Sequence, residues 1–388
     1  MTSPIHAGDR APQPVTYASA GVDTEAGDRA VELMKDAVRA THTPAVVGGI
    51  GGFAGMVDAS ALLGMRRPLL VTSTDGVGTK VAIAQAMDIH DTIGHDLVGM
   101  VVDDIVVVGA RPVLMTDYIA CGSVVPERIA AIVRGIAEAC ALVGTPLLGG
   151  ETAEHPGLLG AHEYDVAGAA TGVVEADAVL GAERVRDGDV VIAMAASGLH
   201  SNGYSLVRRV IDVAGWEFDR DVPAFGRTLG EELLEPTRLY TPACLDLIGA
   251  PGVEVHAFSH VTGGGLAANL ARVLPPGLCA GVDRASWVVP PVFDVVRALG
   301  SVPWDDLEGT LNLGVGMVAV VSRDSADAAV AAVRAAGIDA WVLGEVTGAG
   351  QEPGGPTGPG HASDARLVAG TKGVDGGAVL LTGAYRTA

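Results

Sequence analysis

The sequence predicts an α+β protein with mixed helices and strands in two domains. The chain has 388 residues, more than one ordinary core holds, and 49% of them are apolar, which is enough for a sizeable interior. Short apolar runs typical of strands alternate with helical spacing in both halves of the chain. The charged and turn-rich stretch 175–189 separates the halves, so we place the domain boundary near residue 177.

Residues 17–177 are predicted to form the first domain, after a flexible arm at 1–16 that has no periodicity. Asp91 is a suitable N-cap for a long helix, and Pro126 suits the first turn of the next one. The remaining elements follow from apolar runs or helical spacing. The predicted helices are 30–38, 80–89, 91–107 and 126–143, and the predicted strands are 69–74, 113–120, 145–148 and 166–174.

Residues 178–348 are predicted to form the second domain, which repeats the alternation of strands and helices. Its predicted strands are 190–196, 253–259 and 313–321, and its predicted helices are 201–214, 266–274 and 325–336. The segment 349–377 is rich in Gly and Pro, which predicts an exposed and mobile insert. Residues 378–388 are predicted to form a last strand and a tail.

The charge balance is strongly acidic, because 25 Lys and Arg residues stand against 46 Asp and Glu residues, a net charge of −21. Such a surface repels nucleic-acid phosphates and anionic lipids, so neither is an expected partner. No apolar run reaches the roughly 18 residues of a membrane helix, and the start of the chain lacks the apolar core of a signal peptide. The four cysteines form no Cys-x-x-Cys pair. We therefore expect a soluble, cytoplasmic protein.

A glycine-rich loop, Asp75-Gly76-Val77-Gly78-Thr79-Lys80, lies between a predicted strand and a predicted helix, where ligands bind in α/β folds. Its glycines let the backbone approach a ligand, and the following helix directs N–H groups at an anion. Asp75 can hold Mg²⁺, and Lys80 can balance phosphate charge. The alternative is an ordinary Gly-rich turn capped by an aspartate.

Two further acidic segments hold candidate metal ligands. Asp103 and Asp104 lie in a long predicted helix, and Asp104 falls in its apolar stripe, where an unpaired carboxylate is costly. Glu151 follows a pair of glycines after a predicted strand. The alternatives are a buried aspartate that accepts backbone N–H bonds and a surface turn with solvated acids.

Two loops, 196–204 and 259–265, carry a histidine together with glycines and hydroxyl groups before a predicted helix. Free N–H groups at a helix start form a cradle for phosphate, and His200 or His260 can act as a general acid or base. A capping histidine without chemistry is the alternative for either loop alone. Two such loops in one domain favour a site that binds phosphate or transfers protons over two capping histidines.

The run Gly49-Ile50-Gly51-Gly52-Phe53-Ala54 matches the G-x-G-x-x-A pattern of dinucleotide-binding folds. The apolar run before it is very short, and the residues after it make a poor helix start. No acidic residue follows on a strand end about 20 residues later. An oxidoreductase that uses NAD is therefore disfavoured.

Taken together, these segments resemble one family, the phosphoribosylformylglycinamidine cyclo-ligases (AIR synthetases) of purine biosynthesis, from about residue 17 to residue 344. The motifs that carry the resemblance are 20–23, 48–53, 75–80, Asp104, 149–154, 200–208, 262–265 and 312–317. The resemblance implies an AIR synthetase-like fold. Its N-terminal domain would bind ATP and form a β-barrel shared between the two chains of a homodimer, and its C-terminal domain would be α/β.

The resemblance also implies an activity, in which formylglycinamidine ribonucleotide is closed to aminoimidazole ribonucleotide while ATP becomes ADP and phosphate. ATP and Mg²⁺ are the implied cofactors, and Asp75, Asp104 and Glu151 are the implied metal ligands. The implied catalytic residues are Lys35, His200 and His260. The implied substrate-binding residues are Ser201, Asn202, Thr262, Gly263 and Gly264. The implied ATP- and phosphate-binding residues are Gly48, Gly49, Gly51 and Gly52 of a lid loop, with Asp75, Gly76, Gly78, Thr79, Lys80 and Asp104.

The sequence departs from the family pattern at a few positions. Ala18 and Ser19 stand where Lys-Asp is common, and Asp103 stands where Asn is usual. Other ATP-using relatives remain alternatives, such as selenide water dikinase or thiamine-monophosphate kinase, although 48–53 lacks the reactive Cys of the selenide enzyme. A non-catalytic nucleotide-binding scaffold is the alternative from a different class.

Overall fold

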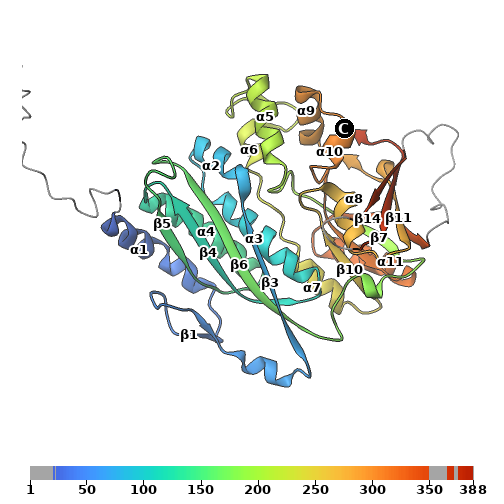
Figure 1. Ribbon diagram of the computed structural model, residues 1–388, viewed down its shortest axis with the longest axis horizontal. Coiled ribbons are helices and arrows are strands. Elements are labelled where there is room, and N and C mark those ends of the chain that lie inside the picture. Colours follow the sequence, from blue (N-terminus) through green and yellow to red (C-terminus); the bar gives the residue numbers. More distant parts are fainter. Residues whose placement is uncertain (1–20, 22, 349–364, 371–374, 388) are drawn as a thin grey trace, which may run out of the picture.

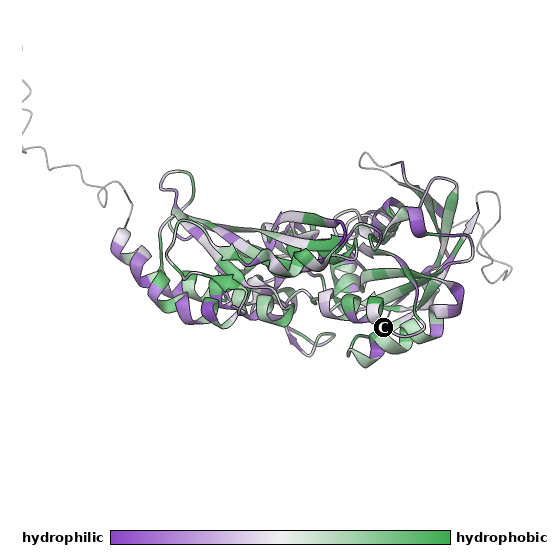
Figure 2. Ribbon diagram, turned by 90° about the horizontal axis from the view of Figure 1, so that it is seen from below, coloured by the Kyte–Doolittle hydropathy of each residue, from purple (hydrophilic) through white to green (hydrophobic). Residues whose placement is uncertain are grey.

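The computed structural model describes residue 21 and residues 23–348, 365–370 and 375–387. The molecule is elongated in two perpendicular views, with the first half of the chain at one end and the second half at the other (Figures 1 and 2). The arm expected at 1–16 lies outside the described residues. Among the helices of the described residues, none is both long enough and apolar enough to cross a membrane.

A four-stranded sheet with the order β3-β6-β4-β5 forms the centre of the first half. Its strands are β3 (Pro68–Gly76), β4 (Arg111–Cys121), β5 (Leu147–Glu154) and β6 (Tyr164–Glu175). Three helices accompany it, α1 (Thr24–Ala40), α3 (Thr92–Val106) and α4 (Pro126–Leu142). Helices α3 and α4 cover one face of this sheet (Figure 1). The other face has exposed apolar side chains, with Leu70 at 71% and Tyr118 at 41% exposure.

Helices α3 and α4 meet through glycines. A Cβ atom on Gly94 would lie 2.2 Å from the carbonyl carbon of Gly135. A Cβ atom on Gly135 would lie 1.9 Å from the carbonyl oxygen of Asp91. The two helix backbones are therefore close enough to exclude any side chain between them, which fixes where α3 lies under the sheet.

A seven-stranded sheet with the order β10-β13-β7-β14-β11-β16-β15 forms the centre of the second half. Its strands are β7 (Val190–Ala195), β10 (Val255–His260), β11 (Leu278–Asp283), β13 (Val315–Val321), β14 (Ala340–Gly348), β15 (Arg366–Ala369) and β16 (Ala378–Thr382). Along β7, Val191 packs in a cluster with Leu270 of α8 (Gly265–Arg272), whereas Ile192 packs in a cluster with Leu247 of α7 (Thr241–Gly249). Helices therefore cover both faces of this sheet, as the period of two along a buried strand requires.

The smaller elements complete the described chain. The other helices are α2 (Val81–Met87), α5 (Tyr204–Ala214), α6 (Leu229–Leu233), α9 (Pro291–Gly300), α10 (Trp304–Glu308) and α11 (Ala326–Ala335). The other strands are β1 (Val46–Val47), β2 (Met56–Val57), β8 (Asp221–Val222), β9 (Arg227–Thr228), β12 (Val288–Val289) and β17 (Arg386–Thr387). The mixed helices and strands in two halves confirm the predicted fold class.

Three local expectations are wrong. The strand expected to end at residue 148 continues as β5 to Glu154, because residues 149–154 pair in parallel with β4 and the pairing outweighs the turn preference of the glycines. Part of the insert expected at 349–377 is strand β15, which pairs with β16. The helix expected from residue 201 begins at Tyr204, because its N-cap Gly203 has a φ of +76°.

Two buried aspartates of α3 join the halves. Asp96 Oδ1 accepts hydrogen bonds from the backbone N–H (2.9 Å) and the hydroxyl (2.6 Å) of Thr237. Asp103 accepts bonds from the N–H of Tyr240 and from the N–H (2.8 Å) and hydroxyl (2.7 Å) of Thr241. Asp103 is therefore a buried aspartate that accepts backbone N–H bonds, which was the alternative to a metal ligand for the acids of this helix. We call this contact region the seam.

Candidate active site

One hydrogen bond joins a carboxylate of the first half to a histidine of the second. Asp104 lies on α3, and His260 is the last residue of β10. The Nδ1 atom of His260 lies 2.9 Å from Asp104 Oδ1. Because Asp103 next to it is fixed to the second half, the seam sets the position of Asp104 as well.

Asp75 completes an acidic group around this histidine. It lies at the end of β3, half-buried, and its carboxylate accepts a bond of 2.7 Å from the N–H of Gly76. Burial raises the pKa of Asp75; the bond from Gly76 lowers it, and the negative charge of Asp104 raises it again. The charge of His260 lowers the pKa, and the net direction is upward because burial is the largest of these effects.

His260 is buried, and its environment favours the protonated ring. Burial alone would lower the pKa, but the hydrogen bond to Asp104 and the charges of Asp104, Asp103 and Asp75 outweigh burial and raise it. Its Nε2 atom has no hydrogen-bond partner. His260 therefore presents a free ring nitrogen beside the acidic group.

His200 has the opposite character. Burial lowers its pKa well below the usual value, and the nearby charges of His260, Lys80 and Arg238 lower it further. Its Nε2 atom accepts a bond of 3.2 Å from the N–H of Ser197, and its backbone has a φ of +61°. His200 is therefore a neutral imidazole held in a backbone conformation that side chains other than glycine rarely adopt.

The two histidine loops and the loop 75–80 are in contact, as expected of one site. The hydroxyl of Ser201 donates to the carbonyl of Val77 at 2.6 Å. The side-chain oxygen of Asn202 accepts a bond of 3.0 Å from the N–H of Gly263. The structure therefore brings together the predicted residues of loops 75–80, 200–204 and 259–265, with Asp104.

Lys80 does not lie where a phosphate could reach it. It is fully buried, and its ammonium group donates to Asp96 Oδ1 (2.8 Å), to the carbonyl of His200 (3.0 Å) and to the carbonyl of Glu235 (2.7 Å). These bonds use all three of its donors. The expectation that Lys80 neutralises phosphate charge does not fit this placement, and Lys80 instead belongs to the seam.

Glu151 does not join Asp75 and Asp104, which corrects the predicted set of three metal ligands. Asp75 lies on β3 and Glu151 on β5, at opposite edges of the sheet, so three strand spacings of about 4.8 Å separate them. Asp75 and Asp117 both pair with Gly168 of β6, so their side chains lie on the same face of the sheet. Glu151 pairs with Tyr118, the next residue along β4, so the side chain of Glu151 lies on the opposite face. Among the described residues, no group of three or more His, Cys, Asp or Glu side chains is arranged to hold a metal ion.

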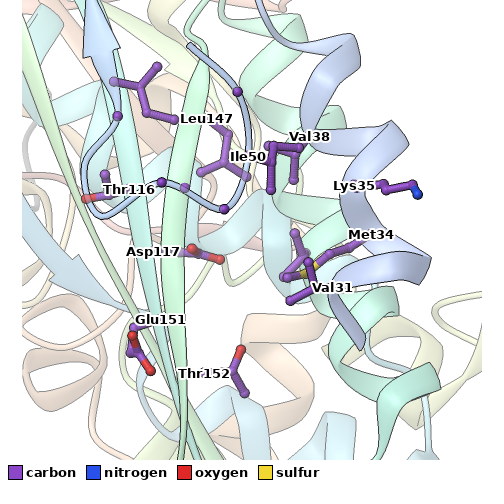
Figure 3. A pocket seen from close by; sticks show the side chains of 18 of the residues that line it. Val31, Met34, Lys35, Val38, Ile50, Thr116, Asp117, Leu147, Glu151 and Thr152 are labelled. Atoms are coloured by element: carbon purple, nitrogen blue, oxygen red, sulfur yellow. The ribbon is translucent and has the colours of Figure 1, made fainter. Parts of the chain in front are cut away.

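Lys35 and the loop 48–53 also lie apart from Asp104. With Glu151 they line a separate pocket of about 570 Å³ between α1, the loop between β1 and β2, and strands β4 and β5 (Figure 3). Its lining includes Gly49, Gly51 and Gly52, and Gly48 begins the same loop. The Lys35 side chain forms an ion pair with Glu32 of its own helix and points away from Asp117 in Figure 3. The single site expected from the sequence is therefore two pockets in this chain.

Two residues that the sequence analysis missed lie at these pockets. Burial raises the pKa of Asp117, on the first pocket, to about 7. Arg272, at the end of α8, lines a second pocket together with Asp104 and His260. The alternation Met115-Asp117-Ile119 was a usable signal for Asp117, because it places a carboxylate between two buried positions of one strand face. The position of Arg272 depends on how α8 packs, for which the sequence has no local signal.

Comparison with known proteins identifies the class of this fold and site. Residues 57–174 match the family model described as the N-terminal domain of AIR synthase related proteins. Residues 186–353 match the model of the C-terminal domain of the same proteins. The chain is thus built as a two-domain protein of the AIR synthase related class.

Two curated relatives cover most of the chain. The phosphoribosylformylglycinamidine cyclo-ligase of Sorangium cellulosum (strain So ce56) is 48% identical over 340 residues, which are 87% of this chain and 97% of that protein. The enzyme of the same name from Geobacillus sp. (strain WCH70) is 47% identical over 331 residues, 85% of this chain and 95% of that protein. The chain belongs to the phosphoribosylformylglycinamidine cyclo-ligase family, ligases that form a carbon–nitrogen bond. The resemblance noted from the motifs is confirmed.

More distant solved structures share the fold. Thiamine-monophosphate kinase from Stenotrophomonas maltophilia K279a has a TM-score of 0.60 at 20% identity, covering 82% of this chain and 94% of that one. A hydrogenase maturation protein in complex with ATP has a TM-score of 0.58 at 18% identity, covering 84% of this chain and 87% of that one. At these identities the likeness concerns the fold alone.

Proposed function

We propose that this protein closes the ring of formylglycinamidine ribonucleotide to give aminoimidazole ribonucleotide, ADP and phosphate. The observation that carries the proposal is the meeting of Asp75, Asp104 and His260 at the seam, in a chain of the cyclo-ligase family. The formamide oxygen of the substrate is a poor leaving group. Attack of this oxygen on the γ-phosphorus of ATP releases ADP and makes the oxygen part of a phosphate ester. The amidine nitrogen then attacks the formamide carbon that bears this oxygen. The C–O bond breaks, phosphate leaves, and the nitrogen loses a proton.

The carboxylates at the seam fit a magnesium ion that accompanies ATP. Asp75 and Asp104 supply carboxylate oxygens, and burial together with the charge of Asp104 raises the pKa of Asp75, which a bound cation would lower. Mg²⁺ in enzymes of this kind is held by one or two carboxylates together with phosphate oxygens and water, so two acids from this chain suffice. The ion would neutralise the charge of the phosphates. Glu151 is not needed for this set.

The remaining side chains have distinct roles in the proposed reaction. His260 touches Asp104 and its Nε2 atom has no partner, so we assign it to binding of the substrate beside the carboxylates. His200 is neutral, buried and bonded to Ser197, so we assign it to positioning of loop 196–204 rather than to proton transfer. Ser201 and Asn202 fix that loop against Val77 and Gly263.

The test is ADP release measured with and without formylglycinamidine ribonucleotide, at saturating ATP and Mg²⁺. We expect turnover of ATP to depend on the substrate and to yield one aminoimidazole ribonucleotide for each ADP. Substrate-independent hydrolysis, or none at all, would contradict the proposal and favour a nucleotide-binding scaffold.

We further propose that two copies of the chain pair through the uncovered face of the sheet β3-β6-β4-β5. This face exposes two large apolar side chains, Leu70 and Tyr118, which a monomer would leave in water. A second copy would cover the face in the shared barrel that the resemblance implies. Sedimentation of the wild type and of Leu70→Asp checks this: we expect a dimer and a shift toward monomer, and a monomeric wild type would contradict the pairing.

A further inference from the structure

The second pocket, at the seam, has a volume of about 360 Å³ and a lining suited to an anion. Residues with hydroxyl side chains line it from both halves of the chain, namely Thr72, Ser73, Ser259 and Thr262. The hydroxyl of Thr72 already donates to the carbonyl of Ala170, and that of Thr262 bonds to Asn269 Oδ1. Asp104 and His260 also border it. A ligand here would therefore touch both the hydroxyl groups and the site of the proposed reaction.

Arg272 supplies the positive charge of this pocket. It is the one Lys or Arg residue among those that line the pocket. Its guanidinium donates one long bond of 3.3 Å to Asn269 Oδ1 and makes no ion pair with a carboxylate of the described residues. In a chain with a net charge of −21, an arginine without an acidic partner at a pocket wall is a marker of an anionic ligand.

A second and independent observation is the free nitrogen of His260. Its side chain is 3% exposed, and its Nε2 atom has no hydrogen-bond partner while Nδ1 is bonded to Asp104. A buried ring nitrogen without a partner is costly unless a ligand or water completes it. The pocket is the space that both His260 and Arg272 border.

We propose that this pocket holds the 5′-phosphate of the ribonucleotide substrate and that Arg272 pairs with it. This inference rests on the proposed function and names the part of the substrate that the pocket recognises. A phosphate monoester accepts hydrogen bonds at every oxygen, which matches a pocket that has the guanidinium of Arg272 and the serine residues Ser73 and Ser259 in its lining. The triphosphate of ATP is assigned to Asp75 and Asp104, where a magnesium ion would accompany it. The substrate phosphate has no such ion and needs a fixed side-chain cation.

Steady-state kinetics of Arg272→Gln and Arg272→Lys test the proposal with two substrates, the ribonucleotide and the corresponding nucleoside without its phosphate. In Arg272→Gln we expect KM for the ribonucleotide to rise about 10- to 100-fold, as for the loss of a charged hydrogen bond. The KM for ATP and the kcat/KM for the nucleoside should stay within about threefold of the wild type. Arg272→Lys should recover part of the loss, because lysine keeps the charge without the paired geometry.

Arg209→Gln is the matched control. Arg209 lies on the outer side of α5, pairs only with Asp212 of the same helix among the described residues, and lines neither pocket. This variant should behave as the wild type with both substrates.

Three outcomes would overturn the assignment. The first is an unchanged KM for the ribonucleotide in Arg272→Gln. The second is an equal loss with the nucleoside, which would indicate a purely structural role. The third is a rise in KM for ATP instead, which would assign the phosphate to ATP.

Calorimetric binding of ribose 5-phosphate to the folded wild type and Arg272→Gln tests the pocket without turnover. We expect the wild type to bind this probe and Arg272→Gln to bind it at least about 10-fold more weakly. Equal binding by the two proteins would overturn the assignment. If the wild type shows no substrate-dependent turnover, the proposed function fails, while this binding measurement still decides on the pocket.

Discussion

At the scale of single residues, the chemistry of the site depends on which carboxylates already accept hydrogen bonds from other groups of the protein. Asp96 and Asp103 bind donors of the second half, whereas Asp104, one residue further along α3, is half-exposed and touches only His260 among the described partners. The sequence singled out Asp104, but for a wrong reason, because the structure buries Asp103 on the apolar side of α3 and leaves Asp104 half-exposed. It could not predict the ion pair between Lys80 and Asp96, because this contact depends on how α2 and α3 pack.

Asp104→Asn should lower kcat by on the order of 100-fold at saturating Mg²⁺, because a neutral amide stabilises phosphate-bound metal and His260 less well. The measurement is the rate of ADP release at saturating substrate. Near-normal turnover would remove Asp104 from the reacting groups. Asp96→Asn is an informative companion, since it alters the same helix but should act on stability.

Asp117 should make stability depend on pH. Burial raises its pKa to about 7, above the value near 4 of an unfolded chain. The folded state keeps the proton up to a higher pH than the unfolded chain does. The contribution of Asp117 to the free energy of unfolding is therefore fully present below pH 4 and is lost as the pH rises to 7. Relative to Asp117→Asn, the wild type should lose up to about 4 kcal/mol of unfolding free energy across this range. Urea denaturation at pH 4.5 and 8 measures it, and a constant difference between the two proteins would contradict the buried carboxyl.

At the scale of elements, local patterns predicted most helices and strands of the first half, and tertiary pairing decided the rest. The long helix from residue 91 follows from its apolar stripe and agrees with α3 within a residue or two. Strand β5 was not predictable past residue 148, since the pairing partner β4 is what extends it. Strand β11 was missed for the same reason, because its register comes from β14 and β16 on its two sides.

Gly135→Ala should destabilise the fold, because a methyl group there meets the backbone of Asp91, which cannot move without shifting α3. We expect a loss of about 1–3 kcal/mol in the free energy of unfolding. Gly27→Ala on α1 is the control, since nothing lies within 4 Å of its Cβ position. That change should stabilise α1 by about 0.5–1 kcal/mol. Equal thermal midpoints for the two variants would contradict the close contact of α3 and α4.

At the scale of the whole molecule, the two halves are joined by buried polar groups rather than by apolar packing alone. Lys80 contacts Asp96, His200 and Glu235, so one side chain connects α3 with two loops of the second half. The sequence predicted two halves and singled out Lys80 and His200, but as residues of the site and not of the junction. It could not predict the junction itself, because such a network depends on the relative position of elements far apart in the chain.

Lys80→Met should cost about 3–5 kcal/mol of stability, since it leaves the buried charge of Asp96 unpaired. The double variant Lys80→Met with Asp96→Asn should recover part of this loss, because the amide is neutral and still accepts the Thr237 donors. Equilibrium denaturation gives both values. If the single and double variants were equally unstable, the buried ion pair would not be the source of the effect.

The double attachment of α3 has a consequence for the working cycle of the enzyme. A hinge motion that separated Asp104 from His260 would also have to break the buried bonds of Asp96 and Asp103. We therefore expect reactants to enter and products to depart through the mouths of the pockets while the two halves stay docked. A covalent cross-link across the junction should leave the catalytic rate intact, in contrast to enzymes that clamp shut around their ligands.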